Sequence, residues 1–114
     1  MELKNPFSNE TRNLFYEKRY QCFNCGANGW DRGGIECHHL LSRISSSPFN
    51  LAPLCGKCHQ RVGHTRDEHR KLFNKTFFWL DAIKYKPTKE DWAFFEKNFD
   101  ELVGEDIIKW MKNQ

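Results

Sequence analysis

The sequence contains no apolar run long enough to cross a bilayer, and residues 1–6 (MELKNP) lack the apolar segment that a secretory signal requires. It also contains no internal repeat and no low-complexity stretch. Disulfides are typical of secreted small domains, so these absences favour a cytoplasmic chain whose cysteines stay reduced. We therefore expect the five cysteines to include metal ligands, with a disulfide framework as the alternative.

The length of 114 residues predicts one domain, or one small core with a helical appendage. A core of this size is thin, so a bound metal would add useful stability. Positive charge is concentrated in residues 1–85, which hold 13 Lys or Arg against 8 Asp or Glu, whereas residues 86–114 hold 5 against 7. This distribution suits an anionic partner such as nucleic acid, although an ordinary surface with a few extra lysines would show the same excess.

Four of the five cysteines form two Cys-x-x-Cys pairs, Cys22/Cys25 and Cys55/Cys58. Each pair presents two sulfurs from one turn, and two such turns complete the tetrahedron that zinc prefers. A shell of four thiolates leaves no open position, so we predict a structural zinc that contributes to folding. Cys37 lies outside the pairs; we interpret it as a small buried apolar residue, with a fifth ligand or a reactive thiol as alternatives.

The expected elements are two short strands followed by helices. Ser8 or Asn9 could cap a helix to about residue 19. Residues 35–39 and 50–54 are typical of strands, and residues 55–59 open a helix that could be interrupted near Gly63. Apolar residues spaced by three and four predict helices on either side of Pro87, the second capped by Thr88 and ended by Gly104, with a last helix near 107–111. Their aromatic stripe is interpreted as core, with a partner surface as the alternative.

Histidines and an asparagine lie among the thiol pairs, in the segments Glu36-Cys37-His38-His39, Asn50 to Cys55, and Cys58-His59. Together with the two knuckles, this order and spacing resembles the HNH endonucleases over roughly residues 22–64. The resemblance implies an α+β fold: a small zinc-stabilised ββα-metal finger with flanking helices, mostly helical outside the hairpin. We expect an N-terminal helical arm at 1–21, the core at 22–71, and a C-terminal helical segment at 72–114 packing on it.

The resemblance also implies roles for individual residues. His39 matches the general base, Asn50 the residue that steadies the hairpin loop and the base, and His38 and His59 the ligands of a catalytic divalent ion such as Mg²⁺, Mn²⁺ or Ni²⁺. His64 could supplement the metal or contact a phosphate. The implied activity is hydrolysis of DNA phosphodiesters, leaving 5′ phosphate and 3′ hydroxyl ends.

The chemistry is consistent with these residue types. A divalent ion neutralises a phosphate oxygen and stabilises the leaving oxygen, and two imidazoles leave most of its coordination sphere free. A third, neutral imidazole can accept the proton of the attacking water, because its ordinary pKa lies near neutrality. His38 and His39 are adjacent, and an ideal strand would point them to opposite faces, so which of them is base and which is ligand stays open.

Each of these residues also has an ordinary interpretation. His64 and His69 could be surface residues and Asn50 a turn residue. Glu36 could reach the metal or be a strand residue facing solvent. Arg43 and Arg61 are the expected DNA contacts among the basic residues near the motif, yet scattered charge on a solvated helix would look the same. The other basic residues in this region are Lys57, Arg66, Arg70 and Lys71.

Two other functions remain open at this point. The chain could be a non-catalytic nucleic-acid-binding zinc module, which would need the thiols and the basic surface alone. It could also be an accessory protein that docks on a phage or host DNA-processing protein through its C-terminal helices, because small proteins of this family are often phage-encoded and assist DNA packaging.

Overall fold

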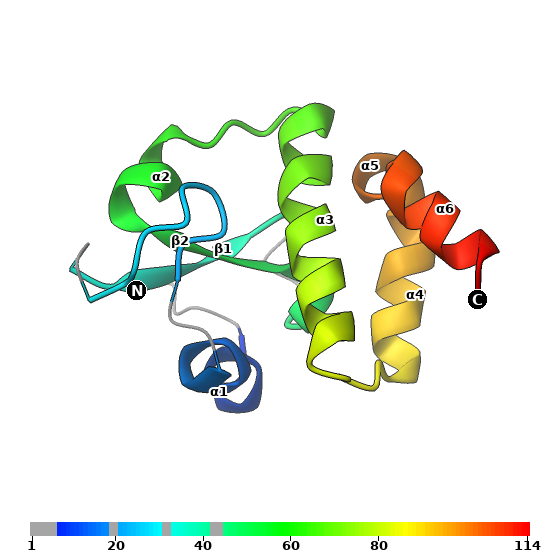
Figure 1. The fold of residues 1–114 in the computed structure, drawn as a ribbon, viewed down its shortest axis with the longest axis horizontal. Helices are drawn as coiled ribbons and strands as arrows, with labels where there is room; N and C mark the ends of the chain where they lie inside the picture. The colour runs from blue at the N-terminus through cyan, green and yellow to red at the C-terminus, as the bar shows by residue number, and fades with distance from the viewer. Residues whose placement is uncertain (1–6, 19–20, 31–32, 42–44) are drawn as a thin grey trace.

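The structure is a computed structural model that describes residues 7–18, 21–30, 33–41 and 45–114. Two strands, β1 (Ile35–His39) and β2 (Leu51–Cys55), form an antiparallel sheet, and β2 runs directly into α2 (Gly56–Arg61). This ββα unit lies at one end of the molecule, and helices make up most of the remainder (Figure 1). The α+β class predicted from the sequence is therefore confirmed.

The register of the hairpin places His38 opposite Ala52 and His39 opposite Leu51. The second strand begins one residue later than predicted, because residues 48–50 form a short 3₁₀ turn, η1 (Pro48–Asn50). Ser47 caps this turn by accepting a hydrogen bond from the amide of Phe49 at 3.1 Å. All five residues of β2 are buried, so this strand is covered on both faces.

Helix α3 (Arg66–Ala82) stands between the ββα unit and the C-terminal helices (Figure 1). It begins at Thr65, whose hydroxyl accepts the amide of Glu68 at 3.2 Å. The buried hydroxyl of Thr76 donates to the carbonyl of Leu51 at 2.8 Å and so ties α3 to β2. The helix ends at Ala82, five residues before the predicted breaker Pro87.

The C-terminal segment forms three helices: α4 (Lys89–Lys97), α5 (Phe99–Leu102) and α6 (Glu105–Lys112). The predicted cap Thr88 is confirmed and forms a capping box, since Thr88 accepts the amide of Asp91 and Asp91 accepts the amide of Thr88. The single helix expected up to Gly104 is instead broken at Asn98, whose side-chain amide donates to the carbonyl of Phe94 at 3.0 Å. Asparagine side chains compete in this way with the backbone ladder.

The core between η1, α3 and α4 is aromatic. Each pair among the four rings has centroids 5.7 to 6.0 Å apart. The rings belong to Phe49, Phe73, Phe77 and Phe95. Buried rings at this spacing contribute buried area and ring–ring contacts, so the interpretation as core is confirmed for Phe73, Phe77 and Phe95, whereas Trp92 is 39% exposed.

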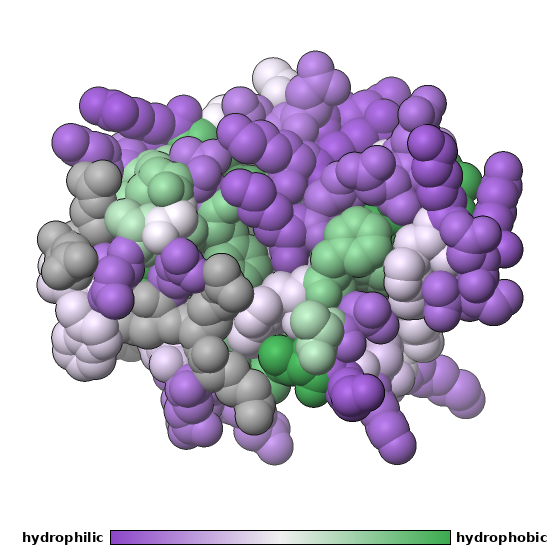
Figure 2. Space-filling model, viewed as in Figure 1, coloured by the Kyte–Doolittle hydropathy of each residue, from purple (hydrophilic) through white to green (hydrophobic). Residues whose placement is uncertain are grey.

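Helix α1 (Asn9–Lys18) begins at the predicted cap Ser8, whose hydroxyl accepts the amide of Thr11 at 3.1 Å. Phe15 stacks on Trp79 of α3 with centroids 4.8 Å apart, and the hydroxyl of Tyr16 donates to the carbonyl of Ile35 at 3.0 Å. None of the helices in the described ranges combines the length and the apolar character needed to cross a membrane. The face shown in Figure 2 is largely hydrophilic over the upper part of α3 and along the C-terminal helices.

Candidate metal centres

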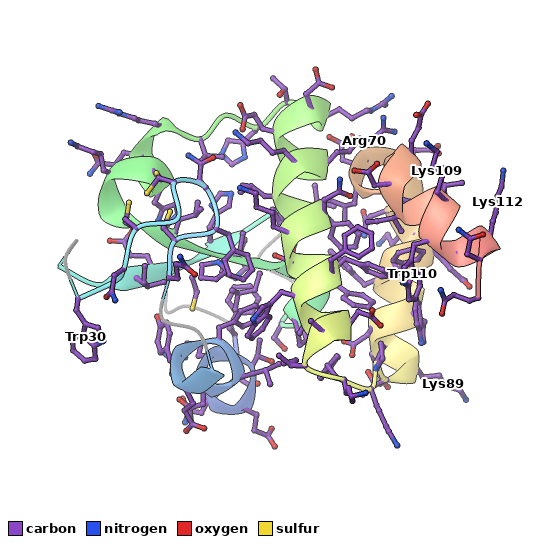
Figure 3. The ribbon with its side chains drawn as sticks, viewed as in Figure 1. Trp30, Arg70, Lys89, Lys109, Trp110 and Lys112 are labelled. Carbon is purple, nitrogen blue, oxygen red and sulfur yellow. The ribbon has the colours of Figure 1, made fainter. Side chains whose placement is uncertain are left out.

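The four predicted zinc ligands converge beside α2. Their sulfur atoms all lie within 4.8 Å of one another, and in Figure 3 the yellow sulfurs gather there. All five cysteines of the chain are free thiols. Four sulfurs at this spacing could hold a metal ion, and the donor set fits structural zinc. The members of this thiol centre are Cys22, Cys25, Cys55 and Cys58.

The first knuckle is shaped by a tight turn. The amide of Gly26 donates to the carbonyl of Cys22 at 2.9 Å, and Gly26 has a φ of +78°, which favours glycine. The amide of Phe23 donates to the carbonyl of Pro53 at 2.8 Å, so the knuckle is docked on β2. These contacts bring Cys25 to within 3.9 Å of Cys55, sulfur to sulfur.

Hydrogen bonds to sulfur prepare the thiol centre for a cation. The amide of Cys25 donates to the sulfur of Cys22 at 3.4 Å, and the side chain of Asn24 donates to the sulfur of Cys58 at 3.3 Å. Burial would raise the pKa of Cys22, but backbone amides lower it to about 6. Burial raises the pKa of Cys58 to about 12. Since thiolates without a cation repel one another, metal binding would displace the remaining protons.

Cys37 lies outside the thiol centre, as expected. It is buried in β1, and its thiol donates to the hydroxyl of Tyr16 at 3.4 Å. The prediction that it is a small buried residue is confirmed.

His38 of β1 and His59 of α2 face each other across the ββα unit. Their ring centroids lie 5.0 Å apart, at an interplanar angle of 76°. Two imidazoles that bind one cation through nitrogens about 2.1 Å from it have ring centres roughly 5 Å apart. His38 is only 4% exposed, and its Nε2 is buried without a hydrogen-bond partner in the described part of the chain. A buried lone nitrogen of this kind calls for a water or an ion.

Glu36 orients His59, a role that the sequence did not reveal. Its Oε1 lies 2.5 Å from Nδ1 of His59. A carboxylate on one ring nitrogen fixes the tautomer and leaves the other nitrogen available to a metal. Glu36 and His38 lie two residues apart and therefore on the same face of β1, which is why both reach His59.

His64 extends this group of rings. Its centroid lies 5.8 Å from that of His38, although its side chain is exposed. Burial, and after it the positive charges of the neighbouring histidines, lower the pKa of His38 to about 4. His38 is therefore neutral at physiological pH, as a metal ligand must be.

His39 points to different partners from those of His38. Its ring stacks on Phe7 with centroids 4.0 Å apart and planes 8° apart. The two adjacent rings therefore point to opposite faces of β1, as the alternation of a strand predicts. Which of them is base and which is ligand was the question that the sequence left open. The catalytic roles of His39 and His38 stay predictions.

Asn50 is fully buried in the turn that leads into β2. Its Oδ1 accepts the amide of Leu41 at 3.0 Å, and its Nδ2 donates to the carbonyl of Ser45 at 3.1 Å. Its carbonyl accepts the amide of Leu40 at 2.9 Å. These bonds fix both ends of the connection between the strands, directly after His39.

The expected DNA contacts are placed only in part. Arg61 is exposed at the end of α2, two residues beyond His59. Arg43 lies outside the described residues.

His69 differs from its surface interpretation. It is 6% exposed in the first turns of α3, and its Nδ1 lies 2.7 Å from Oε2 of Glu101 on α5. Its ring centroid lies 5.9 Å from that of His64. The sequence hid this residue because its partner lies 32 positions away, in a segment with no recognisable motif.

No protein-family model, curated protein or solved structure matches the chain. What it can do chemically therefore rests on its own geometry: a thiol centre that could hold zinc, and beside it an imidazole centre of His38, His59, His64 and His69.

Proposed function

We propose that this chain is a metal-dependent DNA endonuclease of the HNH type. The observation that carries the proposal is the pairing of His38 with His59 on the ββα unit, 5.0 Å apart and with Glu36 on the outer nitrogen of His59. A zinc module that only binds nucleic acid needs the thiols. It has no use for paired imidazoles of which one is buried and the other is oriented by a carboxylate.

The proposed cation site uses His38 and His59 as ligands. When bound, a divalent ion such as Mg²⁺, Mn²⁺ or Ni²⁺ supplies charge neutralisation at a phosphate oxygen and at the leaving 3′ oxygen. His38 offers its buried Nε2, and Glu36 contacts Nδ1 of His59, so that Nε2 is the nitrogen that His59 would offer to the ion. Because only two protein ligands are needed, phosphate and water can share the ion.

His39 is the proposed general base, which takes a proton from the attacking water. Phe7 fixes its ring by stacking, and Asn50 fixes the chain just after it. Neutral imidazole is required for this step, so the cleavage rate should fall below about pH 6. By resemblance to the family, the products carry 5′ phosphate and 3′ hydroxyl ends.

The DNA backbone would be positioned by Arg43, Arg61 and His64, which follow or flank the ligands in the sequence. The C-terminal helices are proposed to contact a phage or host DNA-processing protein. Trp92 and Met111 support this role, because each exposes about two fifths of its surface, 39% and 41%.

A non-catalytic zinc-binding module is the second candidate. It is favoured by the thiol centre, which is the group of potential ligands that gathers most tightly in the described ranges. The two candidates differ in one respect: only the nuclease requires the imidazoles.

A plasmid assay separates these candidates. Zinc-loaded protein is incubated with supercoiled DNA and Mg²⁺, Mn²⁺ or Ni²⁺. The wild type and Gln60→Ala, a matched exposed neighbour of His59, should nick the plasmid. His39→Ala and His59→Ala should lose about 100-fold or more of that rate. Equal nicking by the wild type and His39→Ala would refute the base assignment, and no nicking by the wild type with any ion would favour the module.

A further inference from the structure

The carboxylate of Asp91 on α4 is buried and receives hydrogen bonds from three groups. The residue is only 3% exposed. The hydroxyl of Tyr85 and the amide of Thr88 donate to Oδ2 at 2.6 and 2.9 Å, and the hydroxyl of Ser47 donates to Oδ1 at 2.6 Å. Hydroxyl bonds of this length to a carboxylate are among the strong hydrogen bonds of proteins. Because a buried carboxylate is costly unless its oxygens are paired, these three donors make its burial possible.

The capping role of Asp91 does not require its bond to Ser47. A capping box needs only the bond from the amide of Thr88, and it forms equally well at an exposed helix start. The bond from Ser47 spans 44 positions and leads from α4 to the connection between β1 and β2. Figure 1 shows α4 on the other side of α3 from these two strands. Asp91 therefore ties the connection between the strands to a helix outside the ββα unit.

Ser47 passes this constraint to the 3₁₀ turn η1. A serine hydroxyl has one proton, and since it is donated to Asp91, the lone pairs are left for the amide of Phe49, which donates at 3.1 Å. The carbonyl of Ser47 accepts the amide of Asn50 at 2.9 Å. A hydroxyl whose proton is held by a carboxylate cannot rotate away from the amide that it caps, so Asp91 helps to set the geometry of η1.

The last link runs from Asn50 to the residues that follow His39. The amide of Leu40 donates to the carbonyl of Asn50 at 2.9 Å, and the amide of Leu41 donates to its Oδ1 at 3.0 Å. Asn50 is fully buried, and His39 immediately precedes Leu40. A continuous run of hydrogen bonds therefore leads from α4 through η1 to the backbone of the proposed base.

We propose that Asp91 is a positioning residue for phosphodiester cleavage, which acts through Ser47 and Asn50 on the placement of His39. This rests on the proposed function, in which His39 takes a proton from the attacking water. A general base must lie within hydrogen-bond reach of that proton, and a misplacement of about 1 Å can cost about 100-fold in rate. The C-terminal segment would thus take part in the reaction without touching DNA.

A matched pair of variants tests this role in the zinc-loaded full chain, with supercoiled plasmid and Mn²⁺. Ser47→Ala and Tyr85→Phe each remove one half-buried hydroxyl that donates to Asp91 at 2.6 Å, so both should lose similar stability in chemical denaturation. Ser47→Ala should lower kcat by about 10-fold and leave KM within about twofold, whereas Tyr85→Phe should keep both within about twofold. Ser47→Thr, which retains a hydroxyl, should restore kcat.

Asp91→Asn tests the carboxylate itself, because it keeps the size of the side chain and should also lower kcat by about 10-fold. A wild-type kcat in Asp91→Asn, or equal kcat values for Ser47→Ala and Tyr85→Phe, would overturn the inference.

Amide hydrogen exchange separates this inference from the proposed function. The amide of Leu41 should exchange about 10-fold faster in Ser47→Ala than in Tyr85→Phe, because the turn that holds it opens locally. The amide of the buried Phe73 on α3 should exchange alike in both variants and so report equal global stability. A wild type that cuts no plasmid overturns the proposed function, whereas equal exchange of Leu41 in the two variants overturns the link from Asp91 whether or not DNA is cut.

Discussion

The thiol centre and the imidazole centre share one ββα unit but are built in different ways. The thiols come from two short turns, lie within 4.8 Å of one another and receive hydrogen bonds from residues of the first knuckle. The imidazoles come from β1, α2, the α2–α3 connection and α3, with successive rings 5.0 to 5.9 Å apart. Nδ1 of His59 and Nδ1 of His69 are each held by a carboxylate from another element.

This difference implies that the thiol centre stabilises the fold and that the imidazole centre serves the chemistry. Four thiols can close a metal shell, so the energy of binding there becomes energy of folding. The imidazoles are spaced too loosely to close a shell, and they are mounted on a fold that the thiols and the aromatic core already hold. A ligand lost from the first centre should therefore unfold the protein, whereas one lost from the second should leave the fold intact.

The largest expected effect is on folding, from removal of one thiol. Cys55→Ser should abolish tight zinc binding and lower the free energy of unfolding by about 5 kcal/mol or more, enough to unfold much of the chain at 25 °C. Cys37→Ser is the matched control, because Cys37 is buried in the same sheet but lies outside the thiol centre. Chemical denaturation followed by circular dichroism measures both; equal stability of Cys55→Ser and Cys37→Ser would remove the distinction between the centres.

The next effect is a pH dependence that arises from His38. Burial lowers its pKa in the folded state to about 4, against an ordinary value of about 6.5. Between these values the unfolded chain takes up a proton that the folded chain does not, so stability falls as the pH is lowered from 6.5 to 4. The loss should reach about 3 kcal/mol in protein without a cation on the histidines.

His38→Phe provides the comparison, since it removes the titrating ring and keeps an aromatic side chain at that position. The free energy of unfolding of both proteins is measured between pH 7 and 4. The difference between them excludes the acid sensitivity of the thiol centre, which both proteins share. Parallel pH profiles would show that His38 is not buried as a neutral ring.

A smaller effect is expected from Glu36, which contacts a histidine of the imidazole centre but no thiol. Glu36→Gln should weaken Ni²⁺ binding to the imidazole centre by about 10-fold, because the carboxylate no longer fixes His59. Its zinc content should be unchanged, and because the side chain is exposed the melting temperature should be nearly constant. A parallel loss of zinc would mean that the two centres are coupled rather than separate.

The smallest effect should come from Asn24→Ala. This variant removes the hydrogen bond from Nδ2 to the sulfur of Cys58. Zinc should exchange a few times faster in a competition with a chelator, and plasmid nicking should keep its wild-type rate. The opposite pattern, with nicking impaired and zinc exchange unchanged, would show that Asn24 acts on the imidazole centre and not on the thiol centre.

The thiol centre and the hairpin were predictable from the sequence because their determinants are local. The Cys-x-x-Cys spacing fixes the knuckles, and the capping pair Thr88 and Asp91 marks the start of α4. The strands were found to within one residue, the difference being the turn that contains Asn50.

What the sequence did not reveal depends on distant pairs. The bond between Glu36 and His59 spans 23 positions, and that between His69 and Glu101 spans 32. No periodicity encodes such pairs, so Glu36 and His69 were interpreted as surface residues. The break at Asn98 was also missed, because a side-chain bond to Phe94 overrides an otherwise regular helical pattern.

The metal content of the purified protein tests the separation of the two centres most directly. Elemental analysis after dialysis against a mild chelator should find one zinc per chain in the wild type and in His59→Ala, and none in Cys55→Ser. Loss of zinc from His59→Ala, or a zinc-free wild type whose sulfurs are paired as disulfides, would contradict the account.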